Sequence, residues 1–180
     1  FPDGTLNLNS DGTAITYRKS HQGPNAEYWN QADAEEMARL FRSGTLRPIM
    51  FKDIPVNREA TYVNPVCSEK TKDDGALKFR TRATIGGDRI DYPYTTTAIT
   101  AELESIKLLL NAMISDNAAF STVDLEDFYL GTDLPHPEFI RIPVTFIPRK
   151  VLLFYLLEHL IQKGALYCMV LKTHYGLPQA

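Results

Sequence analysis

Two segments of the chain carry side chains whose types and spacing are suited to chemistry. Ser121–Leu130 delivers a carboxylate, Asp124, from an apolar run, and an aromatic ring, Tyr129, follows a turn later. The second segment is Tyr175-Gly-Leu-Pro-Gln-Ala180. A carboxylate at the exit of a strand is held rigidly and stays open to solvent, which suits it to bind Mg²⁺ for phosphoryl transfer. The pattern indicates a site that holds a metal ion and tests a sugar.

A basic strip has the charge that phosphate oxygens require. Four cations lie close together, whereas the stretch from Glu102 to Asp133 is rich in carboxylates. Arg80 and Arg82 are two residues apart in an alternating segment, so we expect them on one face of a strand. The planar donors of arginine favour bidentate contact with a triphosphate. The four cations of the strip are Lys78, Arg80, Arg82 and Arg89.

Each of these residues also has a purely structural interpretation. Asp124 is placed to cap the next helical turn, with Asp127 adding charge at the start of that helix. Two arginines on a half-exposed strand usually form its solvated face. Tyr129 is equally suited to a core position. Residue types alone leave these alternatives open.

Composition and spacing exclude several other classes. The chain has 180 residues, 44% of them hydrophobic, and a formal net charge of -3, so we expect one globular unit without a general positive coat. Cys67 and Cys168 lack zinc-motif spacing, which predicts two buried or idle thiols. The apolar run Val151–Leu157 is shorter than the ~20 residues of a membrane span and predicts a core helix. The histidines show no zincin spacing, and neither a Gly-x-Ser-x-Gly turn nor a phosphate loop is present.

Periodicity predicts three main helices. The first follows an Asn25 cap and ends at Ser43-Gly44, the second follows a Thr100 cap and ends at Asn117, and the third runs from Pro148 to Gly164. Strands are predicted over residues 76–85, 118–123, 139–142 and 165–171, with extended segments over 46–71 and turns at 11–12 and 125–131. Because helices and strands alternate irregularly, we expect an α+β fold with mixed or antiparallel strands.

Five segments form an ordered set over nearly the whole chain, weakest before Gly23. They are Trp29–Thr45, Lys78–Tyr92, Leu103–Leu110, Asp124–Leu134 and Tyr175–Ala180. In this order they resemble the motifs of the reverse transcriptase of copia-type LTR retrotransposons. One such motif would be weak support, whereas five in the correct sequence make chance similarity improbable.

The resemblance implies the fingers and part of the palm of a right-hand polymerase. Residues 1–100 would form a fingers-like lobe, 101–131 the N-terminal part of the palm, and 132–180 a helix and strand that return to the fingers. The implied activity is RNA-directed DNA polymerisation with Mg²⁺, and the implied partners are an RNA or DNA template-primer, dNTP and the rest of a polyprotein, without a membrane. We expect an intracellular protein, and the start at Phe1 without Met suggests a piece of a longer chain.

The resemblance also assigns roles by position. Asp124 would bind Mg²⁺, with the backbone of Leu125 beside it, and Tyr129 would block a ribose 2′-hydroxyl. Gln179 would contact nucleotide or template. These roles come from the family, not from spacing in this chain.

The basic strand matches the family pattern in its arginines, but the sequence differs from that pattern at other positions. Arg80 and Arg82 would lie on the finger strand that approaches the triphosphate, but Gly86 stands where a lysine is common, and Pro178 replaces a lysine. The Tyr-x-Asp-Asp segment is absent, although two-metal chemistry needs more oxygen ligands than Asp124 alone supplies. We therefore expect that this chain alone does not polymerise. The alternative is a non-catalytic remnant of a retroelement that binds nucleic acid or protein.

Overall fold

The structure, a computed structural model, describes residues 15–72, 74–93, 101–121, 123 and 128–178. It has an α+β fold, as predicted. The helices are α1 (Tyr17–Ser20), α2 (Ala26–Arg42), α3 (Leu103–Ser115) and α4 (Arg149–Phe154). The strands are β1 (Leu46–Ile49), β2 (Thr61–Thr71), β3 (Leu77–Ile85), β4 (Asp133–Pro143) and β5 (Ala165–Lys172). Short 3₁₀ helices are η1 (Phe51–Asp53), η2 (Gly87–Arg89), η3 (Phe128–Gly131), η4 (Val144–Phe146) and η5 (Glu158–Leu160).

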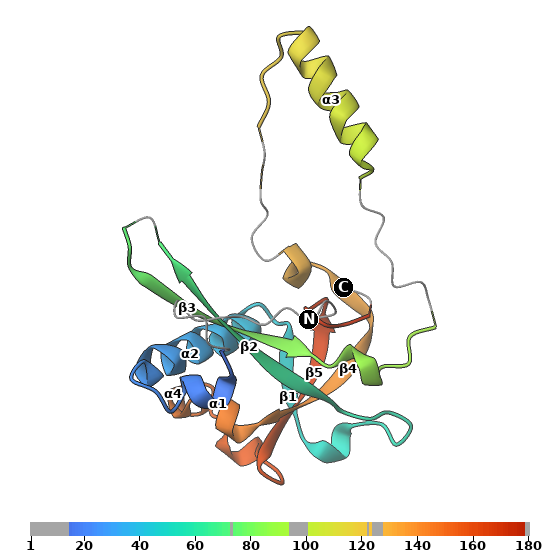
Figure 1. Cartoon of the computed structure of the whole chain (residues 1–180). Coiled ribbons are helices and arrows are strands. Elements are labelled where there is room, and N and C mark those ends of the chain that lie inside the picture. The colour runs from blue at the N-terminus through green and yellow to red at the C-terminus, as the bar shows by residue number, and fades with distance from the viewer. Residues whose placement is uncertain (1–14, 73, 94–100, 122, 124–127, 179–180) are drawn as a thin grey trace.

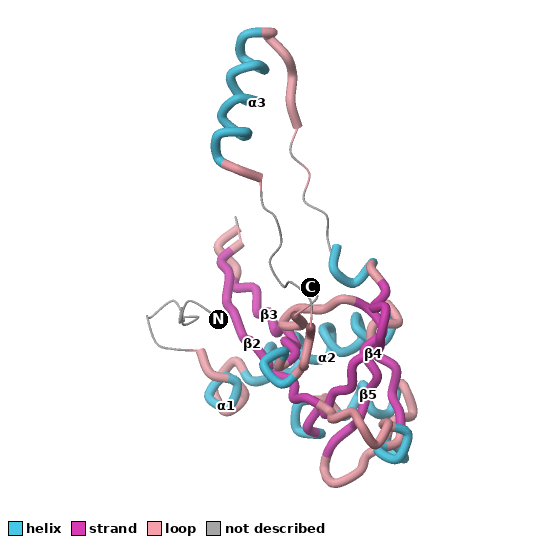
Figure 2. The backbone as a smooth tube through the Cα atoms, turned by 90° about the vertical axis from the view of Figure 1, so that its right-hand side faces the viewer, coloured by secondary structure: helices cyan, strands magenta, loops and turns pink. Residues whose placement is uncertain are grey.

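The five strands form one mixed sheet in the order β1-β5-β4-β2-β3 (Figures 1 and 2). Every neighbouring pair is antiparallel except β2 and β4, which pair in parallel at Thr61 and Tyr62. Beyond that junction β2 continues with β3 as a long hairpin, in which Pro65 lies opposite Ala83. Pro65 fits because a proline, which lacks an N–H group, is tolerated on a strand side that needs no ladder donor.

Helix α2 packs its apolar face against β3, in line with its three- and four-residue periodicity. Trp29, Met37 and Leu40 are fully buried, and Met37 and Leu40 belong to the same core cluster as Ile140 and Leu166 of the sheet. Burial of one such side chain contributes about 1.5–3 kcal/mol relative to exposure. The helix begins after Asn25 as predicted, although the Asn25 side chain makes no capping hydrogen bond.

A polar cluster joins α1 to α2. The buried carboxylate of Asp33 accepts a hydrogen bond from the Tyr17 hydroxyl at 2.7 Å and lies 2.8 Å from Nε2 of His21. Nδ1 of His21 lies 2.8 Å from the Tyr17 carbonyl oxygen. Burial raises the pKa of the Tyr17 hydroxyl, and the hydrogen bond to Asp33 raises it further.

The prediction of a third helix from Pro148 to Gly164 is correct only at its start, because α4 ends at Phe154. Leu156 has a φ of 54°, and its N–H donates to Leu153 while the N–H of Leu157 donates to Leu152. This pattern closes a helix end, a place that usually has a glycine. It buries Leu157 but leaves Leu156 exposed, so the predicted core helix over residues 151–157 is correct only in part. Among the described residues, the α-helices are two long ones, α2 and α3, and two short ones, α1 and α4.

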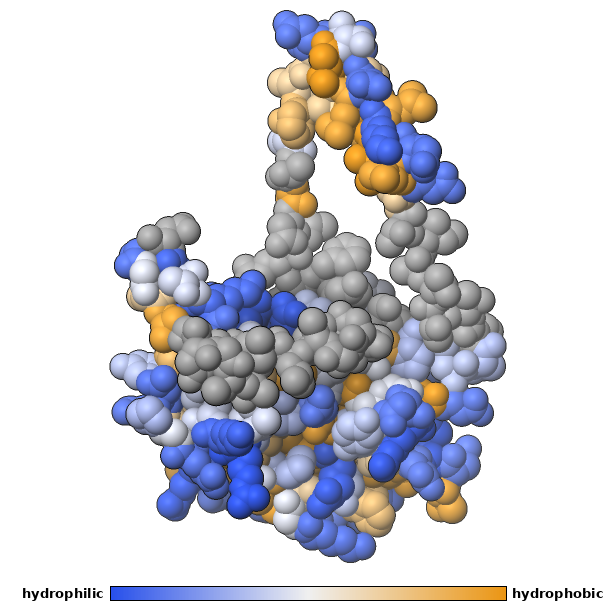
Figure 3. Space-filling view, in the orientation of Figure 1, coloured by the Kyte–Doolittle hydropathy of each residue, from blue (hydrophilic) through white to orange (hydrophobic). Residues whose placement is uncertain are grey.

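Helix α3 forms where predicted, but with Glu102 as its N-cap. The predicted cap, Thr100, lies outside the described residues. At the other end Asn117 adopts a left-handed φ of 48°, which confirms the predicted stop. No residue of α3 is buried, and hydrophobic and hydrophilic atoms lie exposed together on it (Figure 3). Within the described part of the chain, no helix is long and apolar enough to cross a membrane.

The predicted strand over residues 118–123 is also wrong for the residues described there, which have no regular structure. Phe120 and Val123 are exposed. A strand requires a hydrogen-bonded neighbour, and the described part of the chain supplies none at this position. The strands predicted around residues 76–85, 139–142 and 165–171 are confirmed as β3, β4 and β5.

Candidate functional site

The free edge of β3 holds the chain segment that follows β5. The Ala83 N–H donates to the buried carboxylate of Glu36 at 3.0 Å, and the Ala83 carbonyl accepts a hydrogen bond from Nε2 of the buried His174. Two residues further on, the N–H of Ile85 donates to the Tyr175 carbonyl at 2.9 Å. Unpaired groups on a strand edge favour unwanted pairing, and these contacts remove that opportunity. They also fix Tyr175 beside β3.

Two glycines allow this close approach. A Cβ on Gly87 would meet the carbonyl oxygen of Gly176, and it would lie 3.0 Å from Cδ of Pro178. Gly176 has a φ of 92°, and a Cβ there would meet the carbonyl oxygen of Ile85. Both positions therefore require glycine, the second for its backbone conformation as well as for space.

The guanidinium of Arg82 lies over the ring of Tyr175, with its central carbon 4.6 Å from the ring centroid. This is a cation–π contact. Nε of Arg82 is buried and has no hydrogen-bond partner among the described residues, and no described carboxylate forms an ion pair with this guanidinium. A half-buried guanidinium that forms no ion pair is suited to bind an anion such as phosphate.

Arg80 and Arg82 share one face of β3, as predicted from their spacing. Thr81, Ala83 and Ile85 point the other way and are buried, whereas Arg80 is exposed. Lys78 continues the same face toward the tip of the hairpin. Successive members of this row are two residues, or about 6.6 Å, apart. The row is therefore a line of positive charge that ends at Tyr175.

The glycine at position 86 has a steric explanation that the sequence did not reveal. The space that a side chain at Gly86 would enter is filled by the ring of Tyr62. The Tyr62 hydroxyl donates to Oδ1 of Asp88 at 2.7 Å, a bond that raises the pKa of Tyr62, and the Arg89 guanidinium lies 5.0 Å from the centroid of the same ring. A cation, Arg89, therefore lies at this end of the strand, and its guanidinium contacts the Tyr62 ring.

Several predicted site residues cannot be located in the same way. Asp124, Leu125 and Gln179 lie outside the described residues, and Tyr129 belongs to η3. The chain just after η3 does reach the site region, because the N–H of Thr173 donates to the Thr132 carbonyl at 2.8 Å. Leu130 and Leu177 are members of the same buried core cluster. Thr132, which follows η3, and Thr173, two residues before Tyr175, are therefore in direct contact.

Potential metal ligands do not gather in the described part of the chain. No group of three or more His, Cys, Asp or Glu side chains is placed there to hold a metal ion. Cys67 and Cys168 are buried, as predicted, and burial raises the pKa of each thiol. Both thiols are therefore kept in the protonated form, which is a poor metal ligand.

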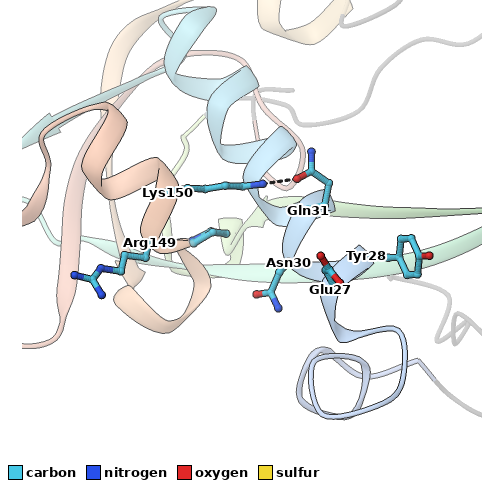
Figure 4. A pocket seen from close by; sticks show the side chains of 7 residues that line it. Glu27, Tyr28, Asn30, Gln31, Arg149 and Lys150 are labelled. Carbon is cyan, nitrogen blue, oxygen red and sulfur yellow. Dashed lines mark hydrogen bonds between the residues drawn. The ribbon is translucent and has the colours of Figure 1, made fainter.

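Two surface pockets lie apart from the arginine row. One, of about 610 Å³, lies between the starts of α2 and α4, where Lys150 donates to Gln31 and Arg149 points away from α2 (Figure 4). The other, of about 700 Å³, is lined by residues that include Arg58, Arg89 and Glu138. Arg58 and Glu138 form an ion pair at 2.5 Å, so part of its charge is already neutralised. Neither pocket includes Arg80 or Arg82.

Comparison with known proteins adds no relative. No family model matches the chain, and no curated protein or solved structure matches it either.

Proposed function

We propose that this chain is the fingers and the N-terminal part of the palm of a reverse transcriptase of the copia-type LTR retrotransposons. In this role it would hold an RNA or DNA template-primer and a dNTP for Mg²⁺-dependent nucleotidyl transfer, together with the rest of a polyprotein. The basis is the ordered set of five motif-like segments, and contact between two of them, the β3 segment and the segment that begins at Tyr175, supports the proposal.

One observation carries the proposal: the Arg80–Arg82 strand and the Tyr175 segment, about ninety residues apart in sequence, lie in direct contact. A polymerase requires this kind of convergence, because phosphoryl transfer depends on positioning and on cations at the phosphate oxygens. Arg82 forms no ion pair among the described residues, so its charge is available for such a contact. The chain after Tyr129 approaches the same region through the Thr132–Thr173 hydrogen bond.

The metal would be held by Asp124 and the backbone of Leu125, with Mg²⁺ supplying charge stabilisation at the transferred phosphoryl group. Tyr129 would exclude a ribose 2′-hydroxyl and Gln179 would contact nucleotide or template. Asp124 is the only carboxylate that the resemblance assigns to the metal in this sequence. We therefore expect no polymerisation by the 180-residue chain itself.

Primer extension tests the proposal. The 180-residue chain and a version extended through a Tyr-x-Asp-Asp segment are compared with Mg²⁺, dNTP and a template-primer. We expect extension only by the longer chain, and a loss of at least a hundredfold in that chain with Asp124→Asn, since a metal ligand is removed. Asp116→Asn, at the exposed end of α3, is the matched control and should leave the rate unchanged. Full activity of the Asp124→Asn variant would exclude the assigned role.

A second candidate is a non-catalytic module that binds nucleic acid or protein. The exposed row Lys78, Arg80 and Arg82 favours it, because phosphate contacts need no metal. This function predicts binding of single-stranded RNA that weakens steeply with salt and does not change when EDTA is added. Neutralising the row would abolish that binding, whereas Asp124→Asn would not affect it.

A further inference from the structure

We propose that Tyr175 is a positioning residue that holds the Arg82 guanidinium for contact with a phosphate-bearing anion. The inference rests on the proposed function, because it assigns the anion site to the same arginine row. It adds a role for the aromatic residue that neither the resemblance nor the spacing of the sequence assigns.

The geometry limits the ways in which Arg82 can move. Its guanidinium carbon lies 4.6 Å from the Tyr175 ring centroid, and its Nε is buried. The ring itself is fixed through its backbone, since the Tyr175 carbonyl accepts the hydrogen bond from Ile85 and the next residue, Gly176, packs against that strand. A long arginine side chain otherwise loses rotamer entropy when a ligand orders it. The ring removes part of that cost before the ligand arrives.

The positive charge of Arg82 is better compensated by an anionic ligand than by the Tyr175 ring alone. Burying a cation without a counter-charge is unfavourable, and an aromatic face compensates it only in part. Other arginines near carboxylates do form ion pairs, as Arg39 does with Glu36 at 2.6 Å and Arg58 with Glu138. For Arg82 the contact in the described structure is the Tyr175 ring, which leaves the positive charge of the half-buried guanidinium without an anionic partner and suits it to bind a phosphate group.

The test is a titration of the 180-residue chain with inorganic tripolyphosphate, followed by calorimetry and by the arginine Nε–H signals in NMR. We expect saturable binding that perturbs the Arg82 signal. Tyr175→Leu should weaken binding about fivefold to tenfold, because the platform is lost, whereas Tyr175→Phe keeps the ring and should bind within about twofold of wild type. Tyr28→Leu is the matched control, since the Tyr28 ring stacks on Phe79 and not on an arginine.

A double-mutant cycle separates positioning from a general structural effect. In an Arg82→Met background, Tyr175→Leu should cause no further loss of affinity. An equal loss in both backgrounds, or wild-type affinity of Tyr175→Leu, would overturn the proposal. If Tyr175→Leu does not fold, Arg82→Lys serves instead, because it keeps the charge but loses the stacking plane, and unchanged affinity in that variant counts against the proposal.

Failure of this inference can be distinguished from failure of the proposed function. Absence of tripolyphosphate binding to the wild-type chain would refute the anion site and the role of Tyr175. The polymerase proposal would then still be decided by whether primer extension in the longer chain depends on Asp124.

Discussion

Gly87 and Gly176 lie so close together that a Cβ on Gly87 would lie 2.1 Å from the Gly176 carbonyl oxygen. The contact closes the end of β3 against the segment that follows β5. It explains in steric terms why glycines stand at these two places, which belong to two separate motif-like segments.

Replacement of Gly87 by alanine should therefore be costly. We expect Gly87→Ala to lower the free energy of unfolding by about 2 kcal/mol or more, because the new methyl group meets rigid backbone. The measurement is urea denaturation followed by circular dichroism. Gly131→Ala is the control, since nothing lies within 4 Å of a Cβ there, and it should change stability by less than about 0.5 kcal/mol. Equal effects of the two changes would contradict the packing described.

A lysine at position 86 should conflict with Tyr62. We expect Gly86→Lys to cost about 1–2 kcal/mol, because the Tyr62 ring has to leave its hydrogen bond with Asp88 and its contact with Arg89. In a Tyr62→Ala background the same change should cost clearly less. Urea denaturation of the two single variants and the double variant measures the coupling, and strictly additive effects would show that the ring does not fill this space.

Alkaline pH should destabilise the fold through its buried thiols. Burial raises the pKa of Cys168, so the thiol stays neutral in the folded chain, whereas in the unfolded chain it ionises near its ordinary pKa of about 8.5. Stability is therefore fully present below that pH and is lost above it, by about 1 kcal/mol for this thiol between pH 8 and pH 9.5. Denaturation midpoints across this range should fall less steeply in Cys168→Ala. An identical pH dependence in the variant would exclude the contribution of Cys168.

The apolar side chains of α3 should contribute little to the stability of the sheet core. Leu108, Leu109 and Ile114 are 71%, 63% and 79% exposed, so we expect each change to glutamine to alter the stability of the core by less than about 0.5 kcal/mol. Binding of a hydrophobic dye should decrease at the same time. By contrast, Leu40→Ala in the core should cost about 3 kcal/mol. Core-like losses from the α3 changes would mean that α3 packs against the body in solution.

Strongly periodic or alternating segments were predictable from sequence. The apolar face of α2 and the alternation of β3 follow directly from side-chain geometry, and so does the shared face of Arg80 and Arg82. The early end of α4 was not predictable. A left-handed residue at a helix end is usually a glycine, whereas here it is Leu156. The predicted strand over residues 118–123 failed because strand formation depends on a neighbour and not only on local residues.

The residues of the site were predictable from the sequence, but the contacts between them were not. The sequence identified the arginines and the Tyr175 segment separately, but their contact depends on non-local hydrogen bonds such as that between Ile85 and Tyr175. The ring of Tyr62 over Gly86 likewise depends on the pairing of β2 with β3. The roles of Asp124, Leu125, Tyr129 and Gln179 stay predictions that rest on the resemblance.

The β2–β3 hairpin is supported over part of its length. Among the described residues, β2 pairs with β4 at Thr61 and Tyr62, and α2 supports the hairpin as far as Phe79, whose ring contacts Tyr28 and Trp29. Toward the turn the described residues of both strands are exposed. Backbone amides near the turn should therefore exchange with solvent faster than those around Arg82, where the Tyr175 segment contacts the strand.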